Sequence, residues 1–161
     1  MLDIVRYGDE ILVKKAEPVK DIDAAIRKLG ADMLETLSGN GVGLAAPQIG
    51  QSLRMFVTDI EGDKHRVFIN PEILLTSQEQ VSFEEGCLSL PKLYIDVIRP
   101  KAIKVQAWNE KGRPFSLEVD GFLARVIQHE NDHLDGILFI DRLKPVKRER
   151  ALRQYSRLSK A

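Results

Sequence analysis

Hydrophobic residues recur at helical spacing in the first quarter of the chain. From Asp21 to Leu37 they fall three or four positions apart, which places them on one face of a helix: Ile22, Ile26, Leu29, Met33 and Leu37. Asp21 is a residue type that caps helix N-termini, and Gly39-Asn40-Gly41 is typical of a helix end. The pattern predicts an amphipathic helix over 21–37.

The middle of the chain shows shorter patterns. The segment Gly41–Gly50 is too apolar for a flexible linker and too interrupted for a helix, so we expect an ordered loop. Four later runs are typical of short strands: Arg54–Ile60, Arg66–Ile69, Ile103–Trp108 and Phe115–Asp120. Asn70-Pro71 is expected to end the second run. The turn Asn109–Gly112 joins the last two runs into a predicted β-hairpin.

Helical spacing returns in the last third of the chain. A helix is predicted from Phe122 to Leu134, and Gly136 is typical of the position that closes such a helix. After Pro145 a basic helix is predicted, with Leu152, Tyr155 and Leu158 as its packing residues. These elements predict an α+β fold of short antiparallel strands packed around a central helix, in a single domain, 1–161.

Composition narrows the class of protein without identifying a function. The 161 residues are 43% hydrophobic and 30% charged, as in an ordinary globular domain. Lys plus Arg equals Asp plus Glu at 24 each, so net charge gives no argument for binding DNA. No stretch approaches the roughly 20 apolar residues of a membrane helix. The single cysteine excludes an internal disulfide and favours a reducing compartment.

Candidate chemistry lies on the predicted central helix. His129-Glu130-Asn131-Asp132-His133 has the H-E-x-x-H pattern. Two histidines four residues apart point the same way from a helix, so both can bind one metal ion. Glu130 then lies beside that metal, where it can take a proton from bound water. The pattern predicts a metal-dependent hydrolase.

A catalytic site of this kind needs a third protein ligand. Phe139 occupies the position of the third metzincin histidine, and Glu149, the nearest downstream glutamate, lies in a basic segment. Cys87 and His65 remain. Cys87 could also be a buried small hydrophobe, or a nucleophile with His129 as its base. Because a thiolate binds zinc and ferrous iron well, we favour Cys87 as the third ligand.

Three segments together resemble the peptide deformylase family. Gly41–Gln48 resembles its G-x-G-x-A-A-x-Q motif, Glu85–Ser89 matches E-G-C-x-S, and Gln128–Leu134 matches Q-H-E-x-D-H-L. Each motif is moderately specific alone, but all three in this order and spacing are highly specific. The resemblance covers nearly the whole chain.

The resemblance implies an enzyme that removes the formyl group from N-formylmethionine of nascent polypeptides and releases formate. It implies one Fe²⁺ per chain, which Zn²⁺, Ni²⁺ or Co²⁺ can replace. The family's metal ligands correspond to Cys87, His129 and His133. Its catalytic glutamate corresponds to Glu130, and its oxyanion-stabilising glutamine to Gln48.

A mechanism follows for these residues. Metal-bound hydroxide attacks the formyl carbon, and Glu130 acts first as general base and then as the acid that protonates the leaving amine. The side-chain amide of Gln48 and the backbone N–H of Leu88 are expected to stabilise the oxyanion.

Selectivity for methionine requires an apolar pocket beside the metal. The residues expected to bind substrate are Val42, Gly43, Leu88, Tyr94, Arg125 and Val126. Backbone groups near Gly43 and Leu88 are expected to pair with an extended peptide. For Leu44, core packing is the better interpretation. Glu85 and Arg99 are either an ion pair that fixes the cysteine loop or ordinary surface charges.

The C-terminal segment concentrates positive charge. Its basic residues are Lys144, Lys147, Arg148, Arg150, Arg153, Arg157 and Lys160, against a single Glu149. We interpret them first as the solvent-exposed face of the last helix, with ribosome docking as the alternative. The first fifteen residues lack a signal peptide, and the start at Met1 favours a cytoplasmic bacterial enzyme over the mature form of an organellar one.

Overall fold

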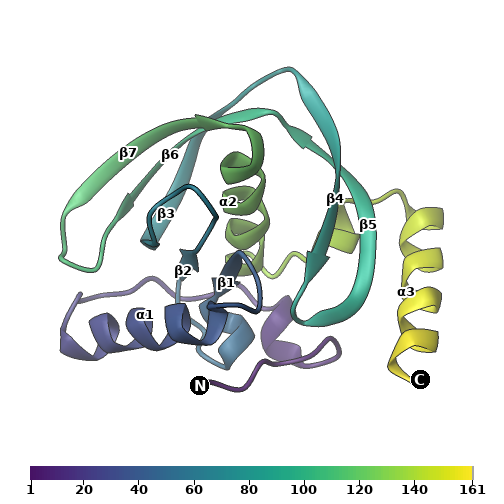
Figure 1. Cartoon of the computed structure of the whole chain (residues 1–161), viewed down its shortest axis with the longest axis horizontal. Helices are drawn as coiled ribbons and strands as arrows, with labels where there is room; N and C mark the ends of the chain where they lie inside the picture. The colour runs from purple at the N-terminus through teal and green to yellow at the C-terminus, as the bar shows by residue number, and fades with distance from the viewer. Residues whose placement is uncertain (161) are drawn as a thin grey trace.

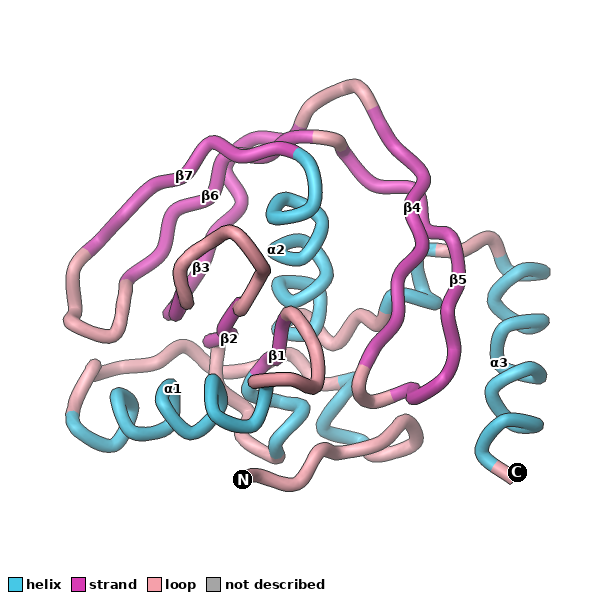
Figure 2. The backbone as a smooth tube through the Cα atoms, in the orientation of Figure 1, coloured by secondary structure: helices cyan, strands magenta, loops and turns pink. Residues whose placement is uncertain are grey.

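The computed structural model describes residues 1–160, which form two antiparallel β-sheets and three α-helices (Figures 1 and 2). Five strands form one sheet in the order β1-β2-β3-β6-β7: β1 (Gly43–Ala45), β2 (Met55–Thr58), β3 (Arg66–Thr76), β6 (Ala102–Trp108) and β7 (Pro114–Asp120). The second sheet is a hairpin of β4 (Gln80–Cys87) and β5 (Leu90–Pro100). The helices are α1 (Ala24–Leu37), α2 (Gly121–Leu134) and α3 (Pro145–Ser159). Short 3₁₀ turns are η1 (Glu10–Val13), η2 (Ala46–Ile49) and η3 (Phe139–Arg142).

Helix α2 lies between the two sheets. In Figure 1 the five-stranded sheet curves past one side of α2, the β4–β5 hairpin lies on the other side, and α3 lies outside β5. The apolar face of α2 enters the core of the larger sheet, where Ala124 and Ile127 are buried in one cluster with Phe56 and Phe68. The predicted α+β fold around a central helix is confirmed. None of the helices in the described residues is long and apolar enough to span a membrane.

The predicted helices are present, with small differences at their ends. Helix α1 begins at Ala24, and its N-cap is Asp23 rather than Asp21, because the Asp23 carboxylate accepts a hydrogen bond from the backbone N–H of Ile26 at 3.0 Å. Helix α2 ends at Leu134, and Gly136 adopts the left-handed conformation expected beyond a helix end, with φ of +73°. Helix α3 packs as predicted, with Leu152, Tyr155 and Leu158 against a cluster that includes residues of β5.

The strands differ more from the prediction. The hairpin of β6 and β7 is confirmed, and the backbone N–H of Asn109 donates to Arg113 across its turn. The expectation that Asn70-Pro71 ends a strand is wrong, because β3 continues to Thr76. The pairing of β3 with β6 shifts between Ile69 and Glu72 instead, since Asn70 takes a φ of +49° and its side chain bonds the backbone of Val19.

The β4–β5 hairpin is an element that the sequence pattern did not lead us to predict. Its strands pair from Gln80 with Pro100 to Cys87 with Leu90, so Cys87 ends β4 beside a tight turn. The glycine-rich loop is ordered, as expected, but contains β1 and η2. Because β1 pairs only with β2, it forms one edge of the larger sheet.

Candidate active site

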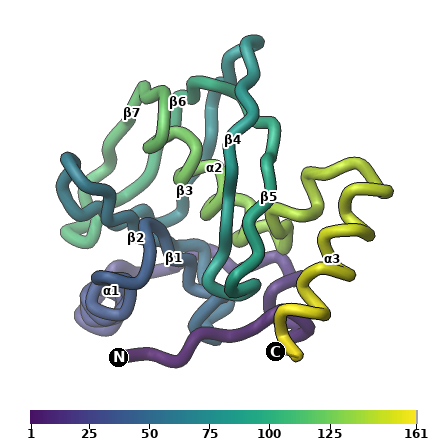
Figure 3. Tube along the Cα trace, turned by 45° about the vertical axis from the view of Figure 1, so that its right-hand side comes forward, coloured from purple at the N-terminus to yellow at the C-terminus, as the bar shows by residue number. Residues whose placement is uncertain are grey.

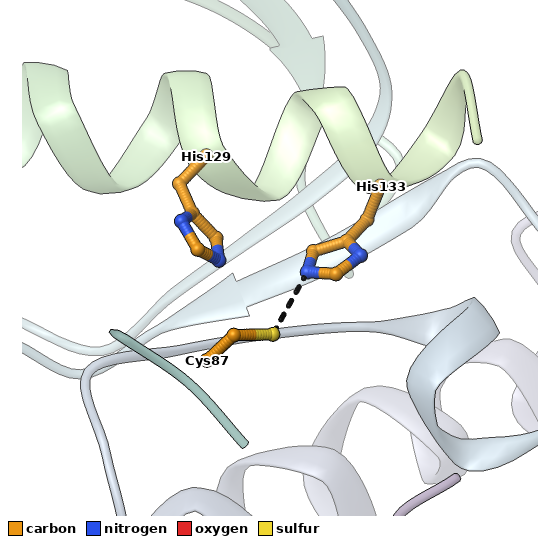
Figure 4. A group of neighbouring side chains, drawn as sticks. All are labelled: Cys87, His129 and His133. Carbon is orange, nitrogen blue, oxygen red and sulfur yellow. Dashed lines mark hydrogen bonds between the residues drawn. The ribbon is translucent and has the colours of Figure 1, made fainter. Parts of the chain in front are cut away.

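Three potential metal ligands meet between α2 and the end of β4. His129 and His133 project from adjacent turns of α2 toward Cys87 (Figure 4), and one donor atom from each residue lies within 4.8 Å of the other two. Cys87 Sγ lies 3.4 Å from Nε2 of His133. Donors bound tetrahedrally to one zinc-sized ion lie about 3.3–3.8 Å apart, so this spacing is close to that of a metal centre.

The first histidine is held in place by Glu85. Its Nδ1 lies 2.8 Å from Oε1 of Glu85, which directs Nε2 toward Cys87 and His133. Burial acts to raise the pKa of Glu85, but hydrogen bonds from His129 and Arg99 outweigh burial and lower the pKa to about 2. The Glu85 side chain is therefore a carboxylate that fixes the ring of His129.

The two histidines have opposite charge preferences. Burial lowers the pKa of His129, but Cys87 and Glu85 more than offset burial and raise the pKa to about 10. These two groups thus favour positive charge at His129, and a divalent cation bound there would also supply it. Burial, followed by the charge on His129, lowers the pKa of His133 well below its usual value and keeps that ring neutral for metal binding.

A buried ion-pair network continues from Glu85. Arg99 makes a two-point contact with Glu85, at 2.6 and 3.0 Å, and also reaches Asp132 at 2.8 Å. Asp132 lies between the two histidines on α2 and binds Arg142 from η3 through both oxygens. Glu85 and Arg99 are therefore an ion pair inside the protein, with 6% and 3% of their surfaces exposed. The alternative that they are ordinary surface charges is wrong.

Glu130 lies beside the candidate metal ligands and against a glycine. Its Oε2 is 4.0 Å from Nε2 of His129, and its Oε1 is buried without a hydrogen-bond partner among the described residues. A Cβ atom on Gly43 of β1 would lie only 2.5 Å from Glu130 Oε2, so a larger residue would displace the carboxylate. Burial raises the pKa of Glu130 to about 7, against the opposing charge of His129, a value that suits proton transfer near neutrality.

The amide of Gln48 is oriented by the backbone. Its oxygen accepts a hydrogen bond from the N–H of Ala45 at 2.9 Å, which leaves Nε2 facing Cys87 Sγ at 3.5 Å and Ser89 Oγ at 3.2 Å. Gln48 and Ser89 are both fully buried or nearly so. A buried amide held on both sides is a preorganised donor beside the three ligands.

A cleft of about 320 Å³ opens onto these groups. All six residues predicted to bind substrate line it: Val42, Gly43, Leu88, Tyr94, Arg125 and Val126. Val42 and Tyr94 are exposed at its mouth, whereas Val126 is buried at its base. Arg125 is also buried, and it donates hydrogen bonds to Glu85 and to the backbone oxygens of Val81 and Val97. Leu44 lies in the core, as expected.

The other candidate ligands lie outside the Cys/His/His group. His65 is exposed and pairs with Asp59 at 3.2 Å. Phe139 stacks against the ring of His129, with centroids 5.8 Å apart, and Glu149 is exposed on α3, 3.9 Å from Arg153. Structural zinc sites normally use four protein ligands. Within the described residues only Cys87, His129 and His133 form such a group, and three ligands fit a catalytic centre better.

Several contacts of the site were not predicted from the sequence. The roles of Asp132 and Arg142 in the ion-pair network were missed, as were the contact of Ser89 with Gln48 and the position of Phe122 in the cleft. The alternation of Leu93, Ile95 and Val97 with polar or exposed residues was a signal for strand β5. Recognising β5 would not by itself have placed Arg99 beside Glu85, because the register pairs Arg99 with Val81 and Glu85 with Ile95.

Comparisons with known proteins agree with this geometry. The sequence matches the family model described as polypeptide deformylase over residues 1–149. It is 49% identical over 158 residues to the peptide deformylase of Treponema pallidum (strain Nichols), covering 98% of this chain and 97% of that protein. It is 45% identical to peptide deformylase 1 of Burkholderia multivorans, covering 100% of this chain and 91% of that protein.

Solved structures show the same fold. A peptide deformylase from Legionella pneumophila superposes with a TM-score of 0.92 at 42% identity, covering 99% of this chain and 96% of the other. A peptide deformylase from Synechococcus elongatus in complex with actinonin superposes with a TM-score of 0.90 at 43% identity, covering 96% and 86%. The chain therefore belongs to the polypeptide deformylase family, whose members are hydrolases that remove formyl groups from N-formylmethionine peptides.

Proposed function

We propose that this chain removes the formyl group from N-formylmethionyl ends of nascent polypeptides by metal-dependent hydrolysis, releasing formate. The observation that carries the proposal is the meeting of Cys87, His129 and His133, beside Glu130, at a cleft that Cys87, His129 and Glu130 line. Family membership supports the reaction, and this side-chain geometry supports the dependence on a metal. The whole chain, 1–161, is proposed to be a single catalytic domain.

The proposed metal is one Fe²⁺ per chain, held by Cys87, His129 and His133, with Zn²⁺, Ni²⁺ or Co²⁺ able to replace it. A thiolate with two imidazoles is a donor set that suits these ions. When bound, the ion supplies a Lewis acid that acidifies water and polarises the formyl carbonyl.

Glu130 is proposed to move the proton. A carboxylate with a pKa of about 7 takes a proton from attacking water and later gives it to the leaving amine. Its unpartnered Oε1 supports this role, because a buried carboxylate oxygen without a partner is free to bind the water or the amine. Gly43 supports it further, since the absence of a side chain there leaves room for the carboxylate.

Gln48 and Leu88 are proposed to stabilise the negative charge that develops on the formyl oxygen. The Nε2 group of Gln48 faces Cys87, and the backbone N–H of Leu88 belongs to the next residue along the chain. Such donors are effective because they are fixed before the charge appears. One donor is typically worth about 3–4 kcal/mol of barrier.

The substrate is proposed to bind as an extended strand with its methionine side chain near Val126. Val42 and Gly43 on the β1 side, with Leu88 and Tyr94 on the hairpin side, line the cleft into which such a strand would fit. Strand β1 lies at the edge of its sheet, which leaves backbone groups available for pairing. Arg125 is proposed to act mainly through Glu85, because its guanidinium is occupied there.

The proposal is tested by measuring formate release from a short N-formylmethionyl peptide with protein purified without oxygen. Oxygen is excluded because a thiolate on ferrous iron is prone to oxidation. Metal content is measured on the same sample. Release that stops on chelation and returns with Fe²⁺ supports the reaction and the metal together. No release from folded, metal-loaded protein would overturn the proposal, and longer acyl groups would then be tested.

Docking of α3 on the ribosome is proposed as a further interaction. Lys147, Arg150 and Arg157 are exposed, while the opposite face of the helix packs on the protein through Leu152 and Tyr155. A helix with one face packed and one face basic suits a polyanion such as ribosomal RNA. Reversing these three charges should abolish salt-sensitive co-sedimentation with ribosomes, and absence of binding by the parent would refute docking. We also propose a cytoplasmic location, because the proposed substrate is the end of a nascent chain.

A further inference from the structure

The N-terminal segment lies outside the cleft and connects the segments of Gln48 and Ser89. Figure 3 shows this segment passing below the β4–β5 turn toward α3. Leu2 and Ile4 pack in the cluster that contains α1 and β2, whereas Val5 and Tyr7 pack in the cluster that contains β5 and α3. Tyr7 contacts Tyr155 of α3 edge to face, with ring centroids 5.9 Å apart. The segment is thus anchored in both cores.

Two of its backbone N–H groups bind the two chain segments that carry the proposed oxyanion donors. Val5 N–H donates to the carbonyl oxygen of Gln48 at 2.7 Å, and Tyr7 N–H donates to the carbonyl oxygen of Ser89 at 2.9 Å. Ser89 follows Leu88 directly, and its hydroxyl contacts the amide of Gln48 at 3.2 Å. The same two segments are therefore connected through side chains, from Gln48 to Cys87 and Ser89, and again through the N-terminal backbone.

We propose that Val5–Tyr7 is a positioning clamp, whose two N–H groups hold the segments of Gln48 and Leu88 at the separation that oxyanion stabilisation requires. The inference rests on the proposed function, since it assumes that Gln48 and Leu88 are the donors. It extends that function to residues of the chain that do not line the cleft.

The physical reason is that the two donors come from different parts of the fold. Gln48 belongs to η2, next to the edge strand of the larger sheet, and Leu88 belongs to the turn of the separate β4–β5 hairpin. No strand pairing joins these two sheets in the described residues. A donor displaced by about 1 Å loses much of its effect, so a connection that fixes their separation acts directly on the transition state.

The clamp is tested by removing one N–H with Val5→Pro. We expect kcat for formate release to fall about tenfold, with KM within about twofold of the parent and metal content unchanged. The loss falls on kcat because oxyanion donors act on charge that develops only in the transition state. It is smaller than the 10²–10³-fold loss typical of removing a whole donor, because Gln48 is still present.

Two matched variants serve as controls. Val5→Ala shortens the side chain but keeps the N–H, and Arg6→Pro introduces proline at an exposed position whose N–H makes no hydrogen bond among the described residues. Both should keep kcat within about twofold of the parent. In a Gln48→Ala background, Val5→Pro should lower kcat less than twofold, because the donor that it positions is gone. An equal loss in both backgrounds would overturn the clamp.

The remaining outcomes separate the clamp from the proposed function. If the parent protein is active and Val5→Pro has the same kcat as Val5→Ala, the clamp alone is overturned. If the parent releases no formate, both the clamp and the proposed function are overturned. If Val5→Pro does not fold, amide hydrogen exchange of the parent decides. The N–H groups of Val5 and Tyr7 should exchange slowly and that of Arg6 fast. Fast exchange at all three would overturn the clamp.

Discussion

The cleft is built differently beside α2 and at its mouth. On the α2 side, polar side chains are buried and paired in a continuous network from Arg125 through Glu85 and Arg99 to Asp132. At the mouth, Val42 is 38% exposed and Tyr94 is 61% exposed, and neither side chain is fixed by a polar contact of this kind. The α2 side is therefore held in one geometry, whereas the side chains at the mouth are not.

This difference has an energetic basis. Buried charges must be paired to be tolerated, and once paired they hold one arrangement, which keeps His129 in a fixed orientation. Exposed apolar residues cost little and adapt to a ligand. Changes on the α2 side should therefore affect chemistry or metal binding, whereas changes at the mouth should affect substrate binding.

The largest effect is expected for Glu130→Gln, which keeps the volume of the side chain but removes its basicity. We expect kcat to fall by at least about 10³-fold, because Glu130 lies beside His129 with a buried, unpartnered oxygen and is the group proposed to take the proton. The measurement is steady-state formate release together with metal content. Loss of metal in this variant would mean that Glu130 is structural, and near-normal turnover would refute its catalytic role.

The second-largest effect is expected for Gly43→Ala. Gly43 lies on β1, against Glu130 of α2. The new Cβ would lie 2.5 Å from Glu130 Oε2, so the carboxylate must move, and we expect kcat to fall about 10²-fold. Gly41→Ala is the control, because its Cβ would make only ordinary contacts, the nearest at 3.4 Å to Leu37. Similar activities for the two variants would show that the fit of Gly43 to Glu130 is unimportant.

The effect of Glu85→Gln on the rate is expected to be smaller. This substitution removes the negative charge that Arg99 and Arg125 share. Removing one member of a buried pair typically costs about 3–5 kcal/mol of unfolding free energy. Loss of the group that orients a ligand histidine typically weakens metal binding about 10–100-fold. Thermal unfolding and metal titration measure the two effects, and unchanged values for both would contradict the role of the network. Glu84→Gln is the control, since Glu84 is its exposed neighbour.

The smallest effect is expected for Tyr94→Ala at the mouth. We expect KM to rise a few-fold with kcat unchanged, because Tyr94 lines the cleft but is not one of the three residues in the Cys87, His129 and His133 group. Kinetics with formylated dipeptides and tetrapeptides would measure the change. A large fall in kcat would mean that the mouth is as tightly coupled to the chemistry as the α2 side.

The same contrast explains what the sequence could predict. The ligands on α2 were predicted because helical periodicity places His129 and His133 together, and the three motifs identified the family. Helical periodicity could not place Cys87, since 42 positions separate it from His129 along the chain, so its prediction rested on excluding other residues, on thiolate chemistry and on the family motif. The contacts of Asp132 with Arg142 and of Val5 with Gln48 depend on how distant elements pack, which local patterns do not contain.

Strand β3, which continues through Asn70-Pro71, illustrates a second limit of prediction from the sequence. Proline and a residue with positive φ usually end a strand, but here the Asn70 side chain forms two hydrogen bonds with Val19 and supports a bulge. A tertiary contact thus overrode a sound local rule. The N-cap of α1 shows a smaller error of the same kind, since Asp21 and Asp23 are both suitable and only the backbone geometry selects Asp23.

The position of α2 late in the chain also determines when the site can form during synthesis of the protein. Cys87 is made before His129 and His133, and the N-terminal segment is made before its partners Gln48 and Ser89. Both walls of the cleft pack on a helix that ends only at Leu134. A growing chain therefore lacks the complete Cys87, His129 and His133 group until residue 133 has been translated, which is more than four fifths of the sequence.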